Sequence, residues 1–390
     1  MNIAETITRY DQRDALPYRS QLQPGTDEYD IYYKMHPELE DKDKLVRVHY
    51  NESKASRVRL EQHPDEWLAN AWVFSTKHST VHELRNSVDG PVNDEKLETD
   101  PHVISKKIKG LARYYGAGIV GIAELNQAWV YSHHAQAQAE EWGKPVELSH
   151  KNVIVMGFPH TWDLWLTSAK TTIPAFMDDW QYYNMMASSA VRLAAAIRDM
   201  GYPARAQIQS NYTCLMPPLA VDAGLGEQCR IGICLSKEYG AAFRLCAVTT
   251  DLPLVPDPPA NLGLEDFCNK CSKCVDACPS GALKVDDKVD VNGHRVWKQD
   301  VYKCFRYWNA KGVSCNICRR ACPWSKPETL PHKIIAHAAQ HLPFLRNLLI
   351  KGDDIVYGKK PRYHPPPQWL RSEDKKMNLG ERFSWWFDHQ

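Results

Sequence analysis

The chain has 390 residues, with 48 Lys and Arg against 47 Asp and Glu, so its formal net charge is +1. This length accommodates two or three domains and a full hydrophobic core. The balanced charge gives no strong attraction toward nucleic acid or an anionic membrane surface, and we expect neither as a partner.

Residues 1–99 are polar and rich in charged, Trp and Tyr side chains, without long periodicity. We expect a peripheral N-terminal cap of loops and short helices. Its first residues show no basic segment followed by an apolar stretch and no adjacent arginine pair, and no apolar segment of the chain approaches the length of a membrane span. These features predict a cytoplasmic protein, provided that no leader has been removed.

Residues 100–255 alternate strand-like and helix-like segments. The predicted elements are a helix from Ile104 to Tyr115, strands at Gly116–Leu125, Asn152–Phe158 and Phe243–Thr249, and a helix at Tyr183–Met200. Glycine and proline after this last helix are typical stop signals. The alternation favours an α/β or α+β core, which a proline-rich hinge at 251–259 connects to the next region.

Eight of the twelve cysteines lie in two runs within residues 256–330, and each run is closed by a proline. The first run is C-x2-C-x2-C-x3-C and the second C-x10-C-x2-C-x3-C, the spacing of paired [4Fe-4S] ligand sets. In bacterial ferredoxins the last cysteine of a run ligates the other cluster. Transferred here, cluster 1 takes Cys268, Cys271, Cys274 and Cys322, and cluster 2 takes Cys278, Cys315, Cys318 and, by elimination, Cys304.

Structural zinc is an alternative, because four-thiolate zinc sites also use C-x2-C pairs, but two runs ending in C-x3-C-P favour iron–sulfur clusters. Disulfides are less favoured still, since such short loops gain little stability from cross-linking. The other cysteines lack ligand spacing and are expected to be small buried hydrophobes: Cys214, Cys229, Cys234 and Cys246. Residues 331–390 are expected to form a tail, helical near 331–351 and wrapping beyond it.

Several segments between about 100 and 360 share one resemblance. They are Gly121–Tyr131, Tyr183–Arg198, Met200–Ala204, Pro218–Glu227 with Arg230, Glu238–Leu245, Thr250–Leu254, Lys303–Trp308 and Leu348–Gly358. Together they resemble the reductive dehalogenases, corrinoid and iron–sulfur enzymes that remove halogen from organohalides. The resemblance implies a nitroreductase-like α/β core with a ferredoxin-like double [4Fe-4S] domain, and a base-off corrinoid (cobalamin) as further cofactor.

The resemblance also implies site residues. Tyr183, at the start of the helix ending in Ile-Arg, matches the family's proton donor, although its neighbour Tyr182 is an alternative. Arg244 matches the basic partner and Asn211 the active-site asparagine. A guanidinium beside a phenol stabilises the phenolate and is expected to lower the phenol's pKa. The loop carrying Gly224, Gly226 and Arg230 is expected to approach the corrinoid, whereas His160 has no expected role because the family binds corrinoid base-off.

The implied function is the replacement of halogen by hydrogen in an organohalide. Aromatic residues that could line an apolar substrate pocket are Trp129, Tyr131, Trp162, Trp165 and Trp180. The expected partners are the organohalide, an external low-potential electron donor of the ferredoxin or flavodoxin type and, as one oligomeric state, a second copy in a homodimer.

Three alternatives stay open. An epoxyqueuosine reductase shares corrinoid and clusters but acts on transfer RNA; it uses an Asp acid and a G-L-G-W-I-G-K motif where this chain has Gly224-Leu-Gly-Glu-Gln-Cys-Arg230. A related corrinoid reductase could act on a substrate other than a halide. A plain electron-transfer protein would use the clusters without any corrinoid.

Overall fold

The computed structural model describes residues 8–47, 76, 81–135, 139–170, 173–209, 211–291, 294–311 and 314–370. Its centre is a four-stranded antiparallel sheet in the order β1-β2-β6-β3. The strands are β1 (Ile119–Glu124), β2 (Asn152–Pro159), β3 (Ala204–Gln207) and β6 (Phe243–Thr250). The three predicted strands are therefore confirmed within a few residues, whereas the short β3 was not anticipated.

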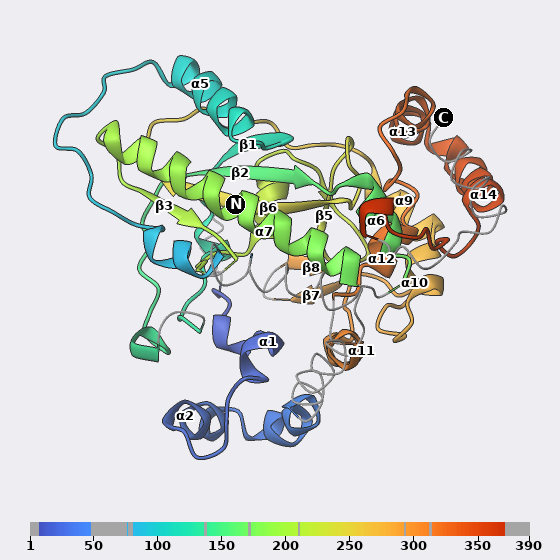
Figure 1. The fold of residues 1–390 in the computed structure, drawn as a ribbon, viewed down its shortest axis with the longest axis horizontal. Helices are drawn as coiled ribbons and strands as arrows, with labels where there is room; N and C mark the ends of the chain where they lie inside the picture. The colour runs from blue at the N-terminus through green and yellow to red at the C-terminus, as the bar shows by residue number, and fades with distance from the viewer. Residues whose placement is uncertain are drawn as a thin grey trace, which may run out of the picture.

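Helices cover both faces of this sheet (Figure 1). Alternate residues of β2 point to opposite faces, as a strand requires. Ile154 and Met156 pack in one core with α5 (Pro101–Tyr114) and α7 (Ile173–Asp199). Val153 and Val155 pack in the second core with α8 (Met216–Asp222). The expected α/β architecture of the core is thus confirmed.

Helix α7 is longer than the sequence pattern suggested. It begins at Ile173, ten residues before the predicted start, with Pro174 in its first turn, where a missing N–H costs nothing. The apolar face continues through Met186, Ala190 and Ile197, all buried. The apolar periodicity did not predict the first turns of α7, because two acidic residues, Asp178 and Asp179, occupy buried positions there.

Short elements complete the core region. They are η3 (Glu83–Ser87), η4 (Gln127–Trp129), η5 (Ala139–Glu141), α6 (Trp162–Thr167), β4 (Glu227–Gln228) and β5 (Cys234–Leu235), the last two pairing as a small ribbon.

The cysteine region and the tail are mainly helical. The former contains α9 (Leu264–Lys270), α10 (Lys273–Ala277), β7 (Val289–Val291), β8 (His294–Val296), α11 (Val301–Lys311) and α12 (Ile317–Ala321). The tail forms α13 (Leu330–His341), η6 (Pro343–Leu345), α14 (Arg346–Tyr357) and η7 (Gln368–Leu370). One hydrophobic cluster joins all three regions, because Leu235, Phe267 and Ile350 belong to it. The domain divisions at 99, 255 and 330 stay predictions.

The N-terminal region packs on the helix that carries Cys304. It contains η1 (Gln12–Asp14), α1 (Leu16–Arg19), α2 (Asp27–Met35) and helical residues 37–47. Leu16 and Val46 share a hydrophobic cluster with Phe305 of α11, and these elements lie side by side in Figure 1. No helix within the described part of the chain has the length and apolar character needed to cross a bilayer.

Gly121 allows α8 to approach the sheet, because a Cβ at this position of β1 would overlap the backbone carbonyl of Ala223. We predict that Gly121→Ala lowers the free energy of unfolding by about 1–3 kcal/mol, as overpacking does. The matched control is Gly110→Ala in α5, where no atom lies within 4 Å of the new Cβ and stability should rise by about 0.5–1 kcal/mol. Melting curves followed by circular dichroism test both, and equal effects would contradict the packing argument.

Candidate active site

Tyr183 and Arg244, which are 61 residues apart in the chain, meet where α7 crosses the end of β6. The Arg244 guanidinium carbon lies 5.5 Å from the centre of the Tyr183 ring, within the range of a cation–π contact. Trp180 packs edge-on against the same ring at 5.3 Å. Tyr183 lies in the interior of its helix, so its predicted position at the helix start is corrected, but its predicted proximity to Arg244 is present.

Asp179, one helical turn before Tyr183 on α7, orients the Arg244 guanidinium. Its Oδ1 accepts hydrogen bonds from Arg244 Nη2 at 2.5 Å and Nε at 3.2 Å. The Asp179 side chain is fully buried, whereas that of Arg244 is 23% exposed. Because residues four apart on a helix share a face, Asp179 and Tyr183 both present themselves to the same guanidinium.

The second cysteine run supplies the next contacts. Asn316, between Cys315 and Cys318, donates to Asp179 Oδ2 at 3.2 Å. Arg319 donates to Asn316 Oδ1 at 3.0 Å and to the carbonyl of Phe243 at 2.7 Å. The loop predicted to hold cluster 2 therefore bonds directly to the carboxylate that orients Arg244.

His160 and Asp178 form the far side of the same buried network. His160 Nδ1 lies 2.6 Å from Asp178 Oδ2, and its Nε2 lies 3.4 Å from Arg319 Nη2. The imidazole stacks on Trp165 at 4.6 Å. From the sequence His160 had no expected role, and no motif pointed to Asp178, Asp179, Asn316 or Arg319. The available signal was a charged Asp-Asp pair directly before an apolar helical face.

Burial dominates the titration of this site. It raises the pKa of Tyr183 above 10, and the lowering effect of Arg244 does not compensate. Arg244 acts on the tyrosine pKa in the expected direction, but desolvation outweighs it and the net shift is upward. Burial together with the adjacent Asp179 raises the pKa of Asp178 to about 8, and burial together with Arg319 and Arg244 lowers the pKa of His160 well below 6.5. Tyr183 consequently carries its proton at neutral pH.

The two adjacent tyrosines face different surroundings. Tyr182 is buried, and its hydroxyl lies 3.0 Å from Thr161 Oγ1. Asn211 is held elsewhere, because Arg205 donates to its Oδ1 at 2.7 Å and its amide donates to the Arg85 carbonyl at 3.0 Å. No contact between described residues joins Asn211 to Tyr183 or Arg244. The neighbouring Tyr212 lies closer, since burial and, to a lesser degree, the Tyr183 phenol raise its pKa.

Of the five aromatic residues predicted to line a substrate pocket, only some lie near Tyr183. Trp165 and Trp180 belong to the network around Tyr183, and Trp162 lies 5.7 Å from the Arg320 guanidinium. Trp129 is engaged with Asp222, to which its indole donates at 2.7 Å, and with the His294 ring. Tyr131 packs on Tyr212 at 6.1 Å.

The two predicted ligand sets stay predictions, but several of their cysteines lie near one another. Cys268, Cys271, Cys274 and Cys322, predicted for cluster 1, line one small cavity together with Cys318, predicted for cluster 2. Cys304 lies on α11 and is exposed. Partial desolvation of its thiol and, to a lesser degree, the nearby thiols of Cys315 and Cys278 raise its pKa to about 11. Thiols converging from several elements suit a cubane cluster, which needs four thiolates around it.

The loop predicted to approach a corrinoid has other contacts. Arg230 is buried and donates to the carbonyls of Cys268, Lys284 and Asp286, so its guanidinium holds the cysteine region in place. A Cβ at Gly224 or Gly226 would overlap the backbone of Pro258 or Leu235. Close packing accounts for all three residues, and their approach to a corrinoid stays a prediction.

The remaining cysteines are buried, as predicted: Cys214, Cys229, Cys234 and Cys246. Cys229 also lines the cavity of the cluster 1 cysteines, a position that its spacing in the sequence does not indicate.

Comparison with known proteins places the cysteine region first. Residues 267–326 match the family model of the 4Fe-4S dicluster domain. The chain is 31% identical over 299 residues to the tetrachloroethene reductive dehalogenase of Sulfurospirillum multivorans, covering 67% of this chain and 58% of that protein. It is 31% identical over 294 residues to the enzyme of the same name from Dehalobacter restrictus, covering 64% and 53%. The chain thus spans little more than half the length of these relatives.

Solved structures agree. A catabolic reductive dehalogenase in complex with 3-bromo-4-hydroxybenzoic acid aligns with a TM-score of 0.65 and 31% identity, over 72% of this chain and 41% of that chain. A B12-dependent dehalogenase aligns with a TM-score of 0.66 and 30% identity over the same shares. A shorter match, 33% identical over 130 residues, is to the epoxyqueuosine reductase of Cyclobacterium marinum.

We predict that Asp179→Ala destabilises the protein by about 3–5 kcal/mol, because it removes the buried carboxylate to which Arg244 and Asn316 both donate. Asp199→Ala, an exposed acid at the end of the same helix, should change the stability by no more than about 0.5 kcal/mol. Anaerobic thermal unfolding measures both. Similar melting temperatures for the two variants would show that the network contributes little.

Asp178 gives the folded protein an unusual pH dependence. Its carboxyl keeps its proton up to about pH 8 in the folded state, against 3.8 when exposed, so stability falls as pH rises between these values. His160, whose folded pKa is depressed, gives the opposite slope below 6.5. Between pH 6.5 and 8 the Asp178 carboxyl contributes a slope of about 1.4 kcal/mol per pH unit.

We therefore expect the melting temperature to decrease from pH 6.5 to 8 and to become nearly constant over this interval in Asp178→Asn. Asp199→Asn is the control that should retain the decrease. An unchanged slope in Asp178→Asn would mean that another group titrates.

Proposed function

The chain belongs to the reductive dehalogenase family, and from this premise we propose that it replaces halogen by hydrogen in an organohalide, with electrons supplied through two [4Fe-4S] clusters. The observation that carries the proposal is the Tyr183–Arg244 pair, placed at the outer end of a buried network whose inner end is the second cysteine loop. This arrangement puts a proton donor and an electron path at one place.

Tyr183 is the proposed proton donor. Its raised pKa keeps the phenolic proton in place until the reaction requires it. Arg244, held by Asp179, then stabilises the phenolate that remains, which is general-acid catalysis with an electrostatic partner. Two electrons and one proton convert the carbon–halogen bond into a carbon–hydrogen bond and release halide. Asn211 is retained as a proposed site residue, supported by the family resemblance rather than by its contacts.

A corrinoid is the proposed second cofactor, as in the B12-dependent relative. The site suits it because Arg244 and Tyr183 are partly exposed while Asp179 is fully buried, so the pair has an open side with Trp180 as an aromatic wall. Tyr183, Arg244 and Trp180 are the side chains that would face the corrinoid. When bound, it supplies the reduced cobalt that delivers electrons to the carbon–halogen bond.

The cluster ligands are proposed as two sets, Cys268, Cys271, Cys274 and Cys322 for cluster 1, and Cys278, Cys304, Cys315 and Cys318 for cluster 2. The match to a dicluster domain and the grouping of the thiols support this assignment. Thiolates reserved for clusters suit a reducing compartment, and we propose a cytoplasmic location. An external low-potential electron donor of the ferredoxin or flavodoxin type and a homodimer complete the proposal.

We predict that Tyr183→Phe lowers halide release at least 100-fold, the range expected when a general acid is lost. The visible absorption of the clusters should not change. Tyr182→Phe is the matched control, because the Tyr182 hydroxyl is directed to Thr161, and it should retain most of the activity. The assay uses protein reconstituted with corrinoid, a reduced viologen and a panel of aryl and alkyl halides.

Two results would contradict the proposal. Normal turnover by Tyr183→Phe would remove Tyr183 as the acid. The second result is that the reconstituted protein reduces an epoxyqueuosine-containing RNA and releases halide from no member of the panel. It would reject the dehalogenase function in favour of epoxyqueuosine reduction.

A further inference from the structure

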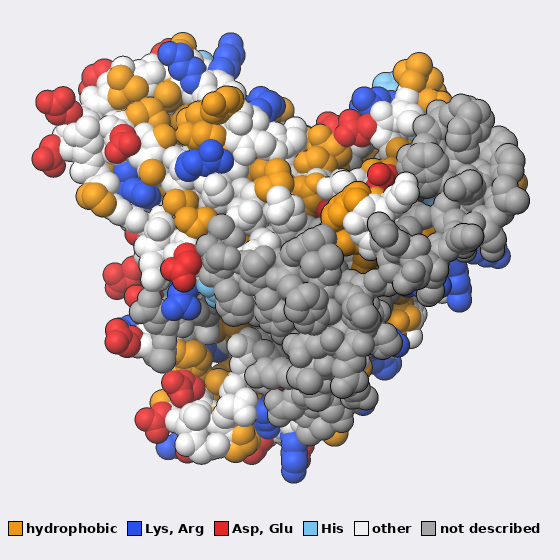
Figure 2. Space-filling model, in the orientation of Figure 1, with side chains coloured by type: hydrophobic (Ala, Val, Ile, Leu, Met, Phe, Trp, Pro, Cys, Tyr) orange, Lys and Arg blue, Asp and Glu red, His pale blue; other side chains and the backbone are white. Residues whose placement is uncertain are grey.

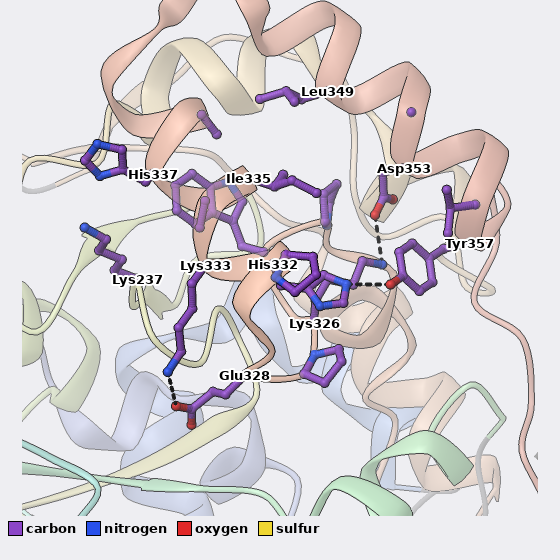
Figure 3. Close-up of a pocket in the computed structure, with 18 of the residues that line it drawn as sticks. Lys237, Lys326, Glu328, His332, Lys333, Ile335, His337, Leu349, Asp353 and Tyr357 are labelled. Carbon is purple, nitrogen blue, oxygen red and sulfur yellow. Dashed lines mark hydrogen bonds and ion pairs between the residues drawn. The ribbon is translucent and has the colours of Figure 1, made fainter. Parts of the chain in front are cut away.

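A groove of about 860 Å³ lies between the C-terminal helices and the cysteine region. Helices α13 and α14 form one wall, and the segment after Cys322 forms the other (Figure 3). The groove contains neither Tyr183 nor Arg244 among its lining residues. It is therefore separate from the candidate active site.

The groove shares a wall with the cavity of the cluster 1 cysteines. Phe267, Pro323 and Trp324 line both spaces. Phe267 precedes Cys268 directly, Trp324 follows Cys322 by two residues, and the two rings meet edge-to-face at 5.6 Å. One layer of side chains thus separates an occupant of the groove from the thiols of cluster 1, whereas the cluster 2 loop is the one that bonds to Asp179.

The two carboxylates of α14, Asp353 at the groove and its neighbour Asp354, are paired with lysines. Lys326 lies 3.0 Å from Asp353, and Lys273 also pairs with Asp353 and lies 3.0 Å from Asp354. Figure 3 shows Lys326 directed at Asp353 and His332 at the Tyr357 hydroxyl. The acidic residues of α14 therefore contribute little negative potential at the surface.

The outer surface of the helical pair is both apolar and basic. Ile335, Leu348 and Val356 line the groove and are 47%, 65% and 62% exposed. The exposed charged side chains of residues 331–370, within the described chain, are all basic: Lys333, Lys351, Lys359, Lys360 and Arg362. Two exposed glutamates, Glu238 and Glu328, also line the groove, and Glu328 lies 3.7 Å from Lys333. Figure 2 shows hydrophobic side chains on this lobe together with Lys and Arg side chains. Exposed apolar side chains with a charged rim are typical of a protein–protein contact.

We propose that this groove is the docking site of a small acidic electron-carrier protein, which reduces cluster 1. The exposed basic side chains of α13, α14 and the segment after them complement an acidic partner, and the apolar side chains of the groove supply the buried contact. Each encounter oxidises the carrier by one electron and reduces cluster 1 by one electron. Cluster 2, bonded through Asn316 to the Asp179–Arg244 pair, is the next acceptor. The inference deepens the proposed function, since it names where the electron donor binds.

The test is the rate of cluster reduction by a reduced acidic ferredoxin, followed by stopped-flow bleaching of the cluster absorption in the full holo-protein. Lys333→Glu/Lys351→Glu should lower the second-order rate at least tenfold at low salt and flatten its salt dependence, because electrostatic steering is lost. Lys106→Glu/Lys107→Glu, a matched reversal at exposed positions of α5, should leave the rate unchanged. Reduction by a viologen should be equal in all variants.

Leu348→Ser provides a second, uncharged probe of the groove and should also slow reduction by ferredoxin alone. Equal ferredoxin rates in wild type and in both groove variants would overturn the proposal. Two other occupants would also overturn it: a second copy, if Leu348→Ser dissociates a dimer seen by sedimentation, or a membrane, if the protein binds anionic vesicles and the groove variants do not.

The viologen-driven halide assay separates the two proposals. Absence of halide release, with ferredoxin reduction still sensitive to the groove variants, would reject the proposed function and retain the docking site.

Discussion

The Asp179–Arg244 ion pair is the interaction on which the arrangement of the site depends. Asp179 is fully buried and lies on α7, Arg244 belongs to β6, and Asn316 reaches the same carboxylate from the second cysteine run. A buried carboxylate is stable only if it is paired and its oxygens are hydrogen-bonded. The requirement of one side chain therefore fixes a helix, a strand and a cysteine loop relative to one another.

This single junction accounts for the coupling of proton and electron supply in the proposed mechanism. Tyr183 lies one helical turn from Asp179, and Cys315 and Cys318 lie on either side of Asn316. His160, Asp178 and Arg319 fill the space behind, so the site rests on charged and polar groups rather than on an apolar core. Such a network is costly if any partner is missing, which makes the geometry of Arg244 well defined.

The molecule presents two functional faces, one to each cluster. The face near cluster 2 holds Tyr183 and Arg244, and the face near cluster 1 holds the groove between α13 and α14. The tail helices share a hydrophobic cluster with the cysteine region through Phe267 and Ile350. The docking proposal combines the exposed apolar and basic side chains of the tail with the adjoining cysteine cavity, because neither feature alone identifies a partner.

The sequence by itself determined the three longer strands and predicted the cluster ligands, because apolar periodicity and cysteine spacing are local properties. The family resemblance supplied the Tyr–Arg pair. Only the tertiary structure decided between Tyr182 and Tyr183 as neighbour of Arg244 and revealed Asp179, Asn316 and the groove. Periodicity identifies buried apolar residues but not a buried charge, whose partners here lie 65 and 137 residues away. Such partners become neighbours only when the chain has folded.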